Sequence, residues 1–184
     1  MTRKIAGVLA MVTMTLSLNG ASGNTADSVR RYWLERPPVN GGVVERGEWL
    51  FRQKGCFLCH GPAGKGGVAN RNYIRDTVPR LSPAQLLKLE EPEDVVTVLE
   101  HFKRGIPLDS LAKDSVPRLE VVLAQYHTIR DLIQSGRTPA KKDPNGPVPP
   151  LKMPSWRRDL SPADIDAILA YLLNTRHQEK ETLN

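Results

Sequence analysis

The feature that most restricts this chain is its cysteine content, because only two cysteines occur in 184 residues. They are Cys56 and Cys59, and His60 follows directly, so the segment reads Cys-Phe-Leu-Cys-His. A single pair cannot build a multi-bridge disulfide framework. Residues three positions apart lie on the same side of a helical turn, where two thiols can react with one partner. The fold therefore has to be explained around a chemical role for this pair.

The pattern C-x-x-C-H is the attachment site of c-type haem. The two thiols can add to the two vinyl groups on one edge of a porphyrin, and the next residue, His60, is carried over the face of the ring. Its imidazole can then bind the iron. The motif predicts one haem c, covalently attached through Cys56 and Cys59, with His60 as an iron ligand.

Three other interpretations of the pair remain open at this point. A thioredoxin-type dithiol lies at the start of a helix that follows a strand, and no strand is evident here. A zinc site needs four ligands, and the adjacent Cys59 and His60 are poorly placed to grip one tetrahedral ion. A disulfide between Cys56 and Cys59 would close too small a loop to stabilise the chain much.

A second axial ligand is expected at Met153, the only methionine after residue 23. It follows a proline-rich loop and precedes Pro154, and a thioether is a soft ligand suited to low-spin haem iron. A methionine that only fills a gap in the core is the plainer alternative. His101 and His127 are rival ligands, but each lies in an amphipathic helical pattern where a surface histidine is the more common outcome.

The amino terminus predicts export. Arg3 and Lys4 precede an uncharged run from residue 5 to 18, and Ala21-Ser22-Gly23 follows, which is the layout of a signal peptide spanning 1–23. The run is short for a membrane helix, which needs about 20 residues, although an uncleaved anchor is the alternative. No later apolar stretch has membrane length, so no transmembrane span is expected after removal of the signal.

The net charge of the chain is mildly basic, which weakly favours an acidic partner surface. Loss of Arg3 and Lys4 with the signal lowers the formal charge from +6 to +4. No dense basic run with interleaved aromatic residues occurs, so nucleic acid is not an expected partner. The glycine-rich segment 61–67 lacks the preceding strand and the Gly-Lys-Ser/Thr ending of a phosphate loop.

The sequence pattern from residue 43 onward predicts an all-α fold. Helices are expected over 43–54, over 82–89 after a capping box, from 92 to a stop at Gly105, over 118–135 before Gly136, and after a second capping box at Ser161. Residues 138–150 contain five prolines and are expected to form an extended loop.

These features together resemble the class I c-type cytochromes. The matching segments are a helix from Gly47 into Cys56–His60, then Pro79-Arg80-Leu81, and then Met153-Pro154 before a helix with Ala170-Tyr171-Leu172. The resemblance implies a cytochrome c domain over 43–176, preceded by an arm 24–42 and followed by a polar tail 177–184. His60 and Met153 lie 93 positions apart, so one helix within 82–136 is extra to the family pattern.

The resemblance also implies roles for individual residues. Pro79 is expected to accept a hydrogen bond from His60 through its carbonyl, and Trp156 is expected to pack near the haem edge, with ordinary core burial as the alternative. Gly47 and Phe51 are expected to meet Ile168 and Tyr171 where the terminal helices cross. The cofactor-binding set is therefore Cys56, Cys59, His60, Pro79, Met153 and Trp156, with His60 and Met153 as the metal ligands.

The implied function is electron transfer, without catalytic residues. If protein ligands fill both axial positions, the iron can only gain and lose an electron. We therefore expect a periplasmic or otherwise exported monohaem carrier that is not an enzyme. Five basic residues flank the Met153 loop and are expected to guide acidic redox partners: Lys141, Lys142, Lys152, Arg157 and Arg158. The alternatives are a haem subunit fixed in a larger periplasmic oxidoreductase, and a haem enzyme or gas sensor with an open sixth position.

Overall fold

The computed structural model describes residues 40–181 of the protein, and side chains up to Thr175. The predicted signal segment 1–23 and nearly all of the arm 24–42 lie outside the described residues, so their expected roles stay predictions. The final helix runs on to Glu181, into the segment that was expected to be a tail.

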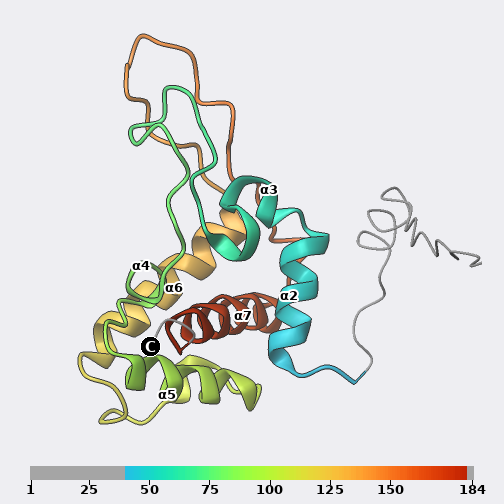
Figure 1. Ribbon diagram of the computed structural model, residues 1–184, viewed down its shortest axis with the longest axis vertical. Helices are drawn as coiled ribbons and strands as arrows, with labels where there is room; N and C mark the ends of the chain where they lie inside the picture. Colours follow the sequence, from blue (N-terminus) through green and yellow to red (C-terminus); the bar gives the residue numbers. More distant parts are fainter. Residues whose placement is uncertain (1–39, 182–184) are drawn as a thin grey trace, which may run out of the picture. The chain divides into compact units, whose positions relative to one another are not determined.

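Six α-helices follow one another along the described chain (Figure 1). They are α2 (Val43–Gln53), α3 (Cys56–His60), α4 (Pro83–Leu87), α5 (Pro92–Lys103), α6 (Leu119–Ser135) and α7 (Pro162–Glu181), with short 3-10 turns at Pro62–Gly64 and Leu108–Ser110. Extended pairing between residues 40 and 181 is limited to isolated bridges. The predicted all-α fold is confirmed. None of the helices described is long and apolar enough to cross a membrane.

Both predicted capping boxes start helices. The Ser82 hydroxyl accepts from the backbone N–H of Gln85 at 3.3 Å, and the Ser82 N–H donates back to the Gln85 side chain at 3.3 Å. At α7, the Asp164 carboxylate accepts from the Ser161 N–H at 3.0 Å, and the Ser161 hydroxyl accepts from the Asp164 N–H at 3.2 Å. These reciprocal bonds satisfy N–H groups that a helix start otherwise leaves unpaired.

The terminal helices α2 and α7 cross in direct backbone contact at Gly47. A methyl group on Gly47 would lie 1.8 Å from the Ala167 carbonyl oxygen, so only glycine fits there. One turn further along, the rings of Phe51 and Tyr171 lie 5.7 Å apart between their centroids. The predicted meeting of these two helices is confirmed, and it joins the helix leading to Cys56 to the long carboxy-terminal helix.

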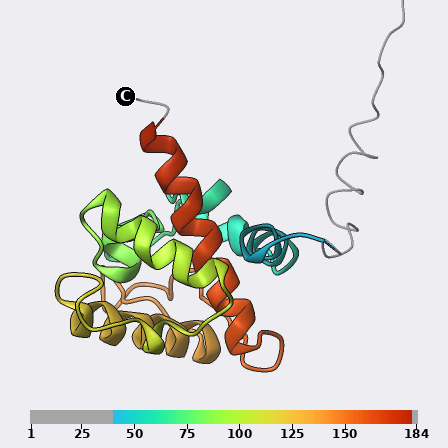
Figure 2. The same ribbon diagram turned by 90° about the horizontal axis from the view of Figure 1, so that it is seen from below.

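The structure distinguishes the two helices that the sequence left equivalent. Helix α5 packs against α7, and α6 packs against α4 and contacts α7 from another side (Figure 2). The Tyr126 hydroxyl of α6, fully buried, donates to Asp166 of α7 at 2.8 Å, and the Tyr126 ring lies 6.1 Å from that of Phe102 in α5. The apolar core therefore forms around α7, with α5 and α6 against it.

Two loops extend together beyond the helices (Figure 1). The first runs from Lys65 to Leu81 and the second from Gly136 to Leu160. A backbone bridge pairs Tyr73 with Lys141 across the two loops, and asparagine side chains add further bonds between the loops. The predicted extended loop 138–150 is confirmed, and its partner is the segment that follows the glycine-rich turn.

Candidate functional site

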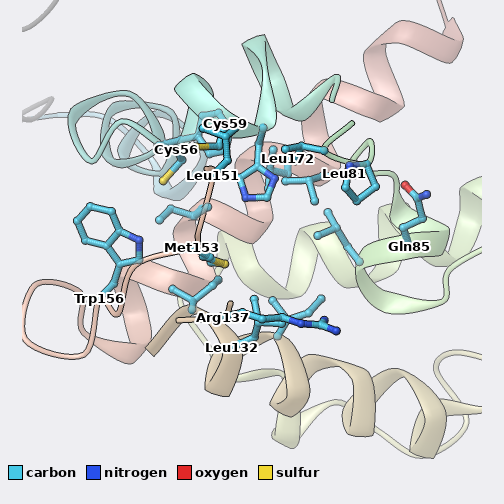
Figure 3. Close-up of a pocket in the computed structure, with 18 of the residues that line it drawn as sticks. Cys56, Cys59, Leu81, Gln85, Leu132, Arg137, Leu151, Met153, Trp156 and Leu172 are labelled. Carbon is cyan, nitrogen blue, oxygen red and sulfur yellow. The ribbon is translucent and has the colours of Figure 1, made fainter. Parts of the chain in front are cut away.

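Helix α3 presents both thiols to one cavity. It is one turn and a half long, between Gly55 and Gly61, whose φ angles of 68° and 73° end the helix on either side. Cys56 and Cys59 are both free and both line the cavity (Figure 3). Burial raises the pKa of the Cys56 thiol to about 11, so this group is protonated at neutral pH. Because Cys56 and Cys59 lie in one helical turn and line one cavity, the helical arrangement predicted for the pair is present.

The glycine-rich turn folds back under His60. The Gly66 N–H donates to the His60 carbonyl at 2.7 Å, and a methyl group on Gly66 would lie 2.5 Å from the Arg80 nitrogen. A residue with a side chain could not pass so close to the backbone at Pro79 and Arg80. The function of the turn is thus to bring Pro79 and Leu81 beside His60, where both line the cavity.

His60 is partly buried, and this burial lowers the pKa of its imidazole. Its Nδ1 is buried without a hydrogen-bond partner. The predicted bond to the Pro79 carbonyl is therefore not formed in this structure, although Pro79 lines the same cavity. When a histidine binds a metal through one ring nitrogen, its other ring nitrogen carries the N–H that can donate a hydrogen bond. The orientation of the His60 ring here does not direct its Nδ1 to the Pro79 carbonyl.

Met153 lies in the same cavity, on the wall provided by the second loop. Figure 3 shows its sulfur between the two cysteines and the end of the cavity at Leu132 and Arg137. The main chain of Met153 is paired with that of Arg137, with N···O distances of 2.9 Å and 3.0 Å. The structure thus brings together the two sulfur-bearing cysteines, the imidazole and the thioether that the sequence singled out.

Trp156 lines the cavity beside Met153 and is partly buried, and its packing at the haem edge stays a prediction. Its backbone N–H donates to the Ile133 carbonyl at 3.1 Å, and the Lys54 ammonium lies 5.9 Å from the centre of its ring. These contacts attach the second loop both to the end of α6 and to the segment just before α3.

The rival histidines lie outside the cavity. The Nε2 of buried His101 is 3.0 Å from the Pro107 carbonyl and 3.2 Å from the Ser110 hydroxyl, and the Arg104 guanidinium approaches its Nδ1 at 3.2 Å. His127 is half exposed and pairs with Asp109 at 2.7 Å. Neither residue lines the cavity. Their geometry favours the local structural roles that the amphipathic patterns indicated.

The residues that line the cavity fit a haem group. It has a volume of about 320 Å³, and its walls are mainly apolar, as expected of a cofactor pocket. His60 brings a buried imidazole with an unpartnered nitrogen, which is expensive in an apolar site unless another group binds there. Two thiols for covalent attachment, together with an imidazole and a thioether as iron ligands, are the groups typical of a haem c site.

Several lining residues had no signal as site residues in the sequence. Ile129 and Ile133 belong to the apolar face of α6, a pattern that indicates packing and no cofactor. The others come from the two loops or from polar positions, without periodicity to identify them: Asn70, Tyr73, Gln85, Gln125 and Arg137. No lining residue comes from α5. Helix α6 is therefore the one that closes the cavity, and α5 is the helix that takes no part in it.

Comparison with known proteins gives one family. The family model for cytochrome c matches residues 44–176, from the start of α2 to well inside α7. No curated protein and no solved structure matches the chain. The matched range contains all six residues that the sequence predicted to bind the cofactor.

Proposed function

The chain belongs to the cytochrome c family, and on this premise we propose that it is an exported carrier of single electrons whose haem iron is ligated by His60 and Met153. Family membership implies covalent haem c at Cys56 and Cys59 and a function in electron transfer. Haem c supplies one iron atom that can gain and lose a single electron. The export, the two axial ligands and the type of partner are the parts proposed here.

The observation that supports this ligation is that His60 and Met153 line one apolar cavity together with both cysteines. A second protein ligand leaves the iron no open position for a substrate, so outer-sphere electron transfer is the remaining chemistry. The thioether of Met153 also raises the reduction potential relative to a second imidazole. The apolar walls exclude water, which strengthens the influence of every ligand and hydrogen bond on that potential.

Residues of the chain perform the supporting tasks. Cys56 and Cys59 fix the edge of the group, so the imidazole of His60 remains at high effective concentration. Leu132, Ile133 and other apolar side chains of α6 cover the Met153 side. Export is supported by the signal-peptide layout of residues 1–23.

An acidic partner surface is supported by the basic residues around the Met153 loop, but not equally by all of them. The Lys142 ammonium pairs with Asp76, and the Lys141 ammonium donates to the carbonyls of Pro144 and Gly146 at 3.1 Å and 2.8 Å. Lys152 and Arg158 are exposed next to the cavity loop. The Arg157 guanidinium donates to the Ser135 hydroxyl at 3.3 Å. We propose that Lys152 and Arg158 contribute most to the attraction of the acidic partner. The charge of Lys142 is compensated by Asp76, and hydrogen bonds hold the Lys141 and Arg157 side chains in place.

Replacement of Met153 with Ala tests the proposed ligation. The ferric wild-type protein is expected to show the far-red charge-transfer band of a methionine–iron bond, and its reduced form is expected to bind carbon monoxide slowly. M153A should lose the band and bind carbon monoxide at least about tenfold faster, because the sixth position is then open. Absorbance spectra and flash or stopped-flow kinetics measure both.

His127→Gln is the matched control, since His127 is half exposed and outside the cavity. It should keep the band and the slow binding. A wild-type protein without the band would contradict ligation by Met153. One that binds carbon monoxide promptly would support an open sixth position and contradict the carrier function.

A further inference from the structure

The loop that carries Met153 has few bonds of its own. Between the end of α6 at Ser135 and the start of α7 at Pro162 the chain has no helix. Its base is closed by the backbone pair between Arg137 and Met153, and Gly136 permits this contact because a methyl group there would lie 2.6 Å from the Met153 carbonyl oxygen. Any further support for Met153 must come from outside the loop.

After Met153, the Trp156 N–H supplies such support by its bond to the Ile133 carbonyl. Before Met153, the support comes from the side chain of Asn70. It is 2% exposed and is one of three buried polar or charged residues in the described chain. Its Nδ2 donates to the Leu151 carbonyl at 3.1 Å, and its Oδ1 accepts from the Leu151 N–H at 3.0 Å. One side chain thus pairs with both main-chain polar groups of Leu151, 81 positions away in the sequence and two residues before Met153.

We propose that Asn70 is a positioning residue for the axial ligand: its amide holds the Leu151–Met153 segment against the cavity and thereby sets how often Met153 leaves the iron. This inference rests on the proposed ligation by His60 and Met153. The two polar atoms of Asn70 bond to the loop, so the residue acts through Leu151.

The physical reason is the cost of leaving the Leu151 main chain unpaired. When an apolar side chain replaces Asn70, the N–H and the carbonyl of the partly buried Leu151 lose their partner, which is less favourable than exchanging the bonds for water. The segment can regain those bonds only by moving outward into solvent. Met153 moves with it, so the open state becomes more populated and dissociation of the ligand becomes faster.

Asn72 provides a matched control on the same pair of loops. Its Nδ2 donates to the carbonyls of Asp143 and Pro147 at 3.1 Å and 2.6 Å, and its Oδ1 accepts from the Asp143 N–H at 2.8 Å. These bonds also join the first loop to the second, but at positions six and ten residues before Met153. A substitution at Asn72 therefore weakens the association of the loops away from the ligand.

The test compares N70L and N72L with the wild-type holoprotein, using imidazole as the entering ligand of the ferric iron. Imidazole can bind only after Met153 has left, so its limiting binding rate at high concentration measures dissociation of the ligand. We expect N70L to raise that rate at least about tenfold and to weaken the charge-transfer band, because two bonds next to the ligand are lost. N72L should stay within about twofold of wild type, and urea unfolding of all three proteins gives their global stability.

The outcomes separate the two proposals. A charge-transfer band in wild type with no acceleration in N70L, or with equal acceleration in N70L and N72L, would overturn the role of Asn70 and leave the ligation by Met153 intact. Absence of the band in wild type would overturn both. If N70L is not matured, N70D replaces it: Asp keeps the oxygen that accepts from Leu151 but cannot donate to its carbonyl, and the same acceleration is expected and decisive.

Discussion

Substitution of Gly47 by alanine tests the contact on which the position of the haem helix depends. The added methyl group would lie 1.8 Å from the Ala167 carbonyl oxygen and 2.4 Å from its carbon. Both atoms belong to the backbone of α7, so no side-chain rearrangement can relieve the overlap. An ordinary contact requires the two helices to separate by about 1.6 Å at the crossing.

The expected cost follows from two opposing effects. Overpacking of this kind costs about 1–3 kcal/mol, and more when the backbone must move. Alanine is a better helix former than glycine by about 1 kcal/mol, which offsets part of the loss. We expect G47A to lower the free energy of unfolding by about 2 kcal/mol, which corresponds to a decrease in Tm of about 4–8 °C for a domain of this size.

Urea and thermal unfolding of the holoprotein, followed by haem absorbance, measure this loss. Glu45→Ala is the control, because Glu45 is exposed in the same helix and its replacement should change stability by less than about 0.5 kcal/mol. If G47A were as stable as wild type or more stable, helix propensity would outweigh the contact, and the close crossing of α2 and α7 would be refuted.

Two further predictions concern charged groups. Burial alone would raise the pKa of Asp164, but hydrogen bonds from Ser161 and Arg46 hold this pKa below its ordinary value. The stability that the Asp164 carboxylate contributes is therefore present above about pH 4 and is lost as the pH falls through its lower pKa in the folded state. D164N should therefore be less stable than wild type by about 1 kcal/mol at pH 7, and urea midpoints should show the difference closing below about pH 4; a difference unchanged at pH 3 would contradict the assignment. The proposed attraction of acidic partners predicts that oxidation of the reduced protein by anionic hexacyanoferrate slows as salt is added, and that K152Q reduces this dependence in stopped-flow measurements; rates indifferent to both would refute it.

The helices could be predicted because their signals are local. The box at Ser82 and the one at Ser161 depend on residues three positions apart, and Gly136 ends α6 where its backbone takes a φ of 73°. The identity of the extra helix could not be predicted, since α5 and α6 both have an apolar face and both end at a glycine. Only the packing of α6 against the cavity distinguishes them, and that is a tertiary property.

The site divides in the same way. Cys56, Cys59 and His60 lie within one short motif, and the chemistry of the motif specifies their geometry. The hydrogen bond from His60 to Pro79 was expected from the family resemblance and is not formed here, since it depends on the orientation of a ring that local sequence does not fix. Asn70 could not be recognised as a site residue, because a side chain that bonds to a distant main chain leaves no periodic pattern.

The two proposed ligands are therefore held in place by different means. His60 is the last residue of α3, between the cysteines that anchor the cofactor and the glycine-rich turn that bonds to its carbonyl. Met153 belongs to a segment without helical hydrogen bonds. Two bonds to Arg137 and two from Leu151 to Asn70 hold its amino-terminal side. Bonds from the residues just after it to the end of α6 hold its carboxy-terminal side. Opening of the Met153 side breaks loop contacts of this kind, whereas displacement of His60 requires α3 itself to unfold against a covalent anchor. Local fluctuations of lowest free energy should consequently affect the methionine bond first, so that substitutions in the two loops alter ligand exchange before they alter global stability.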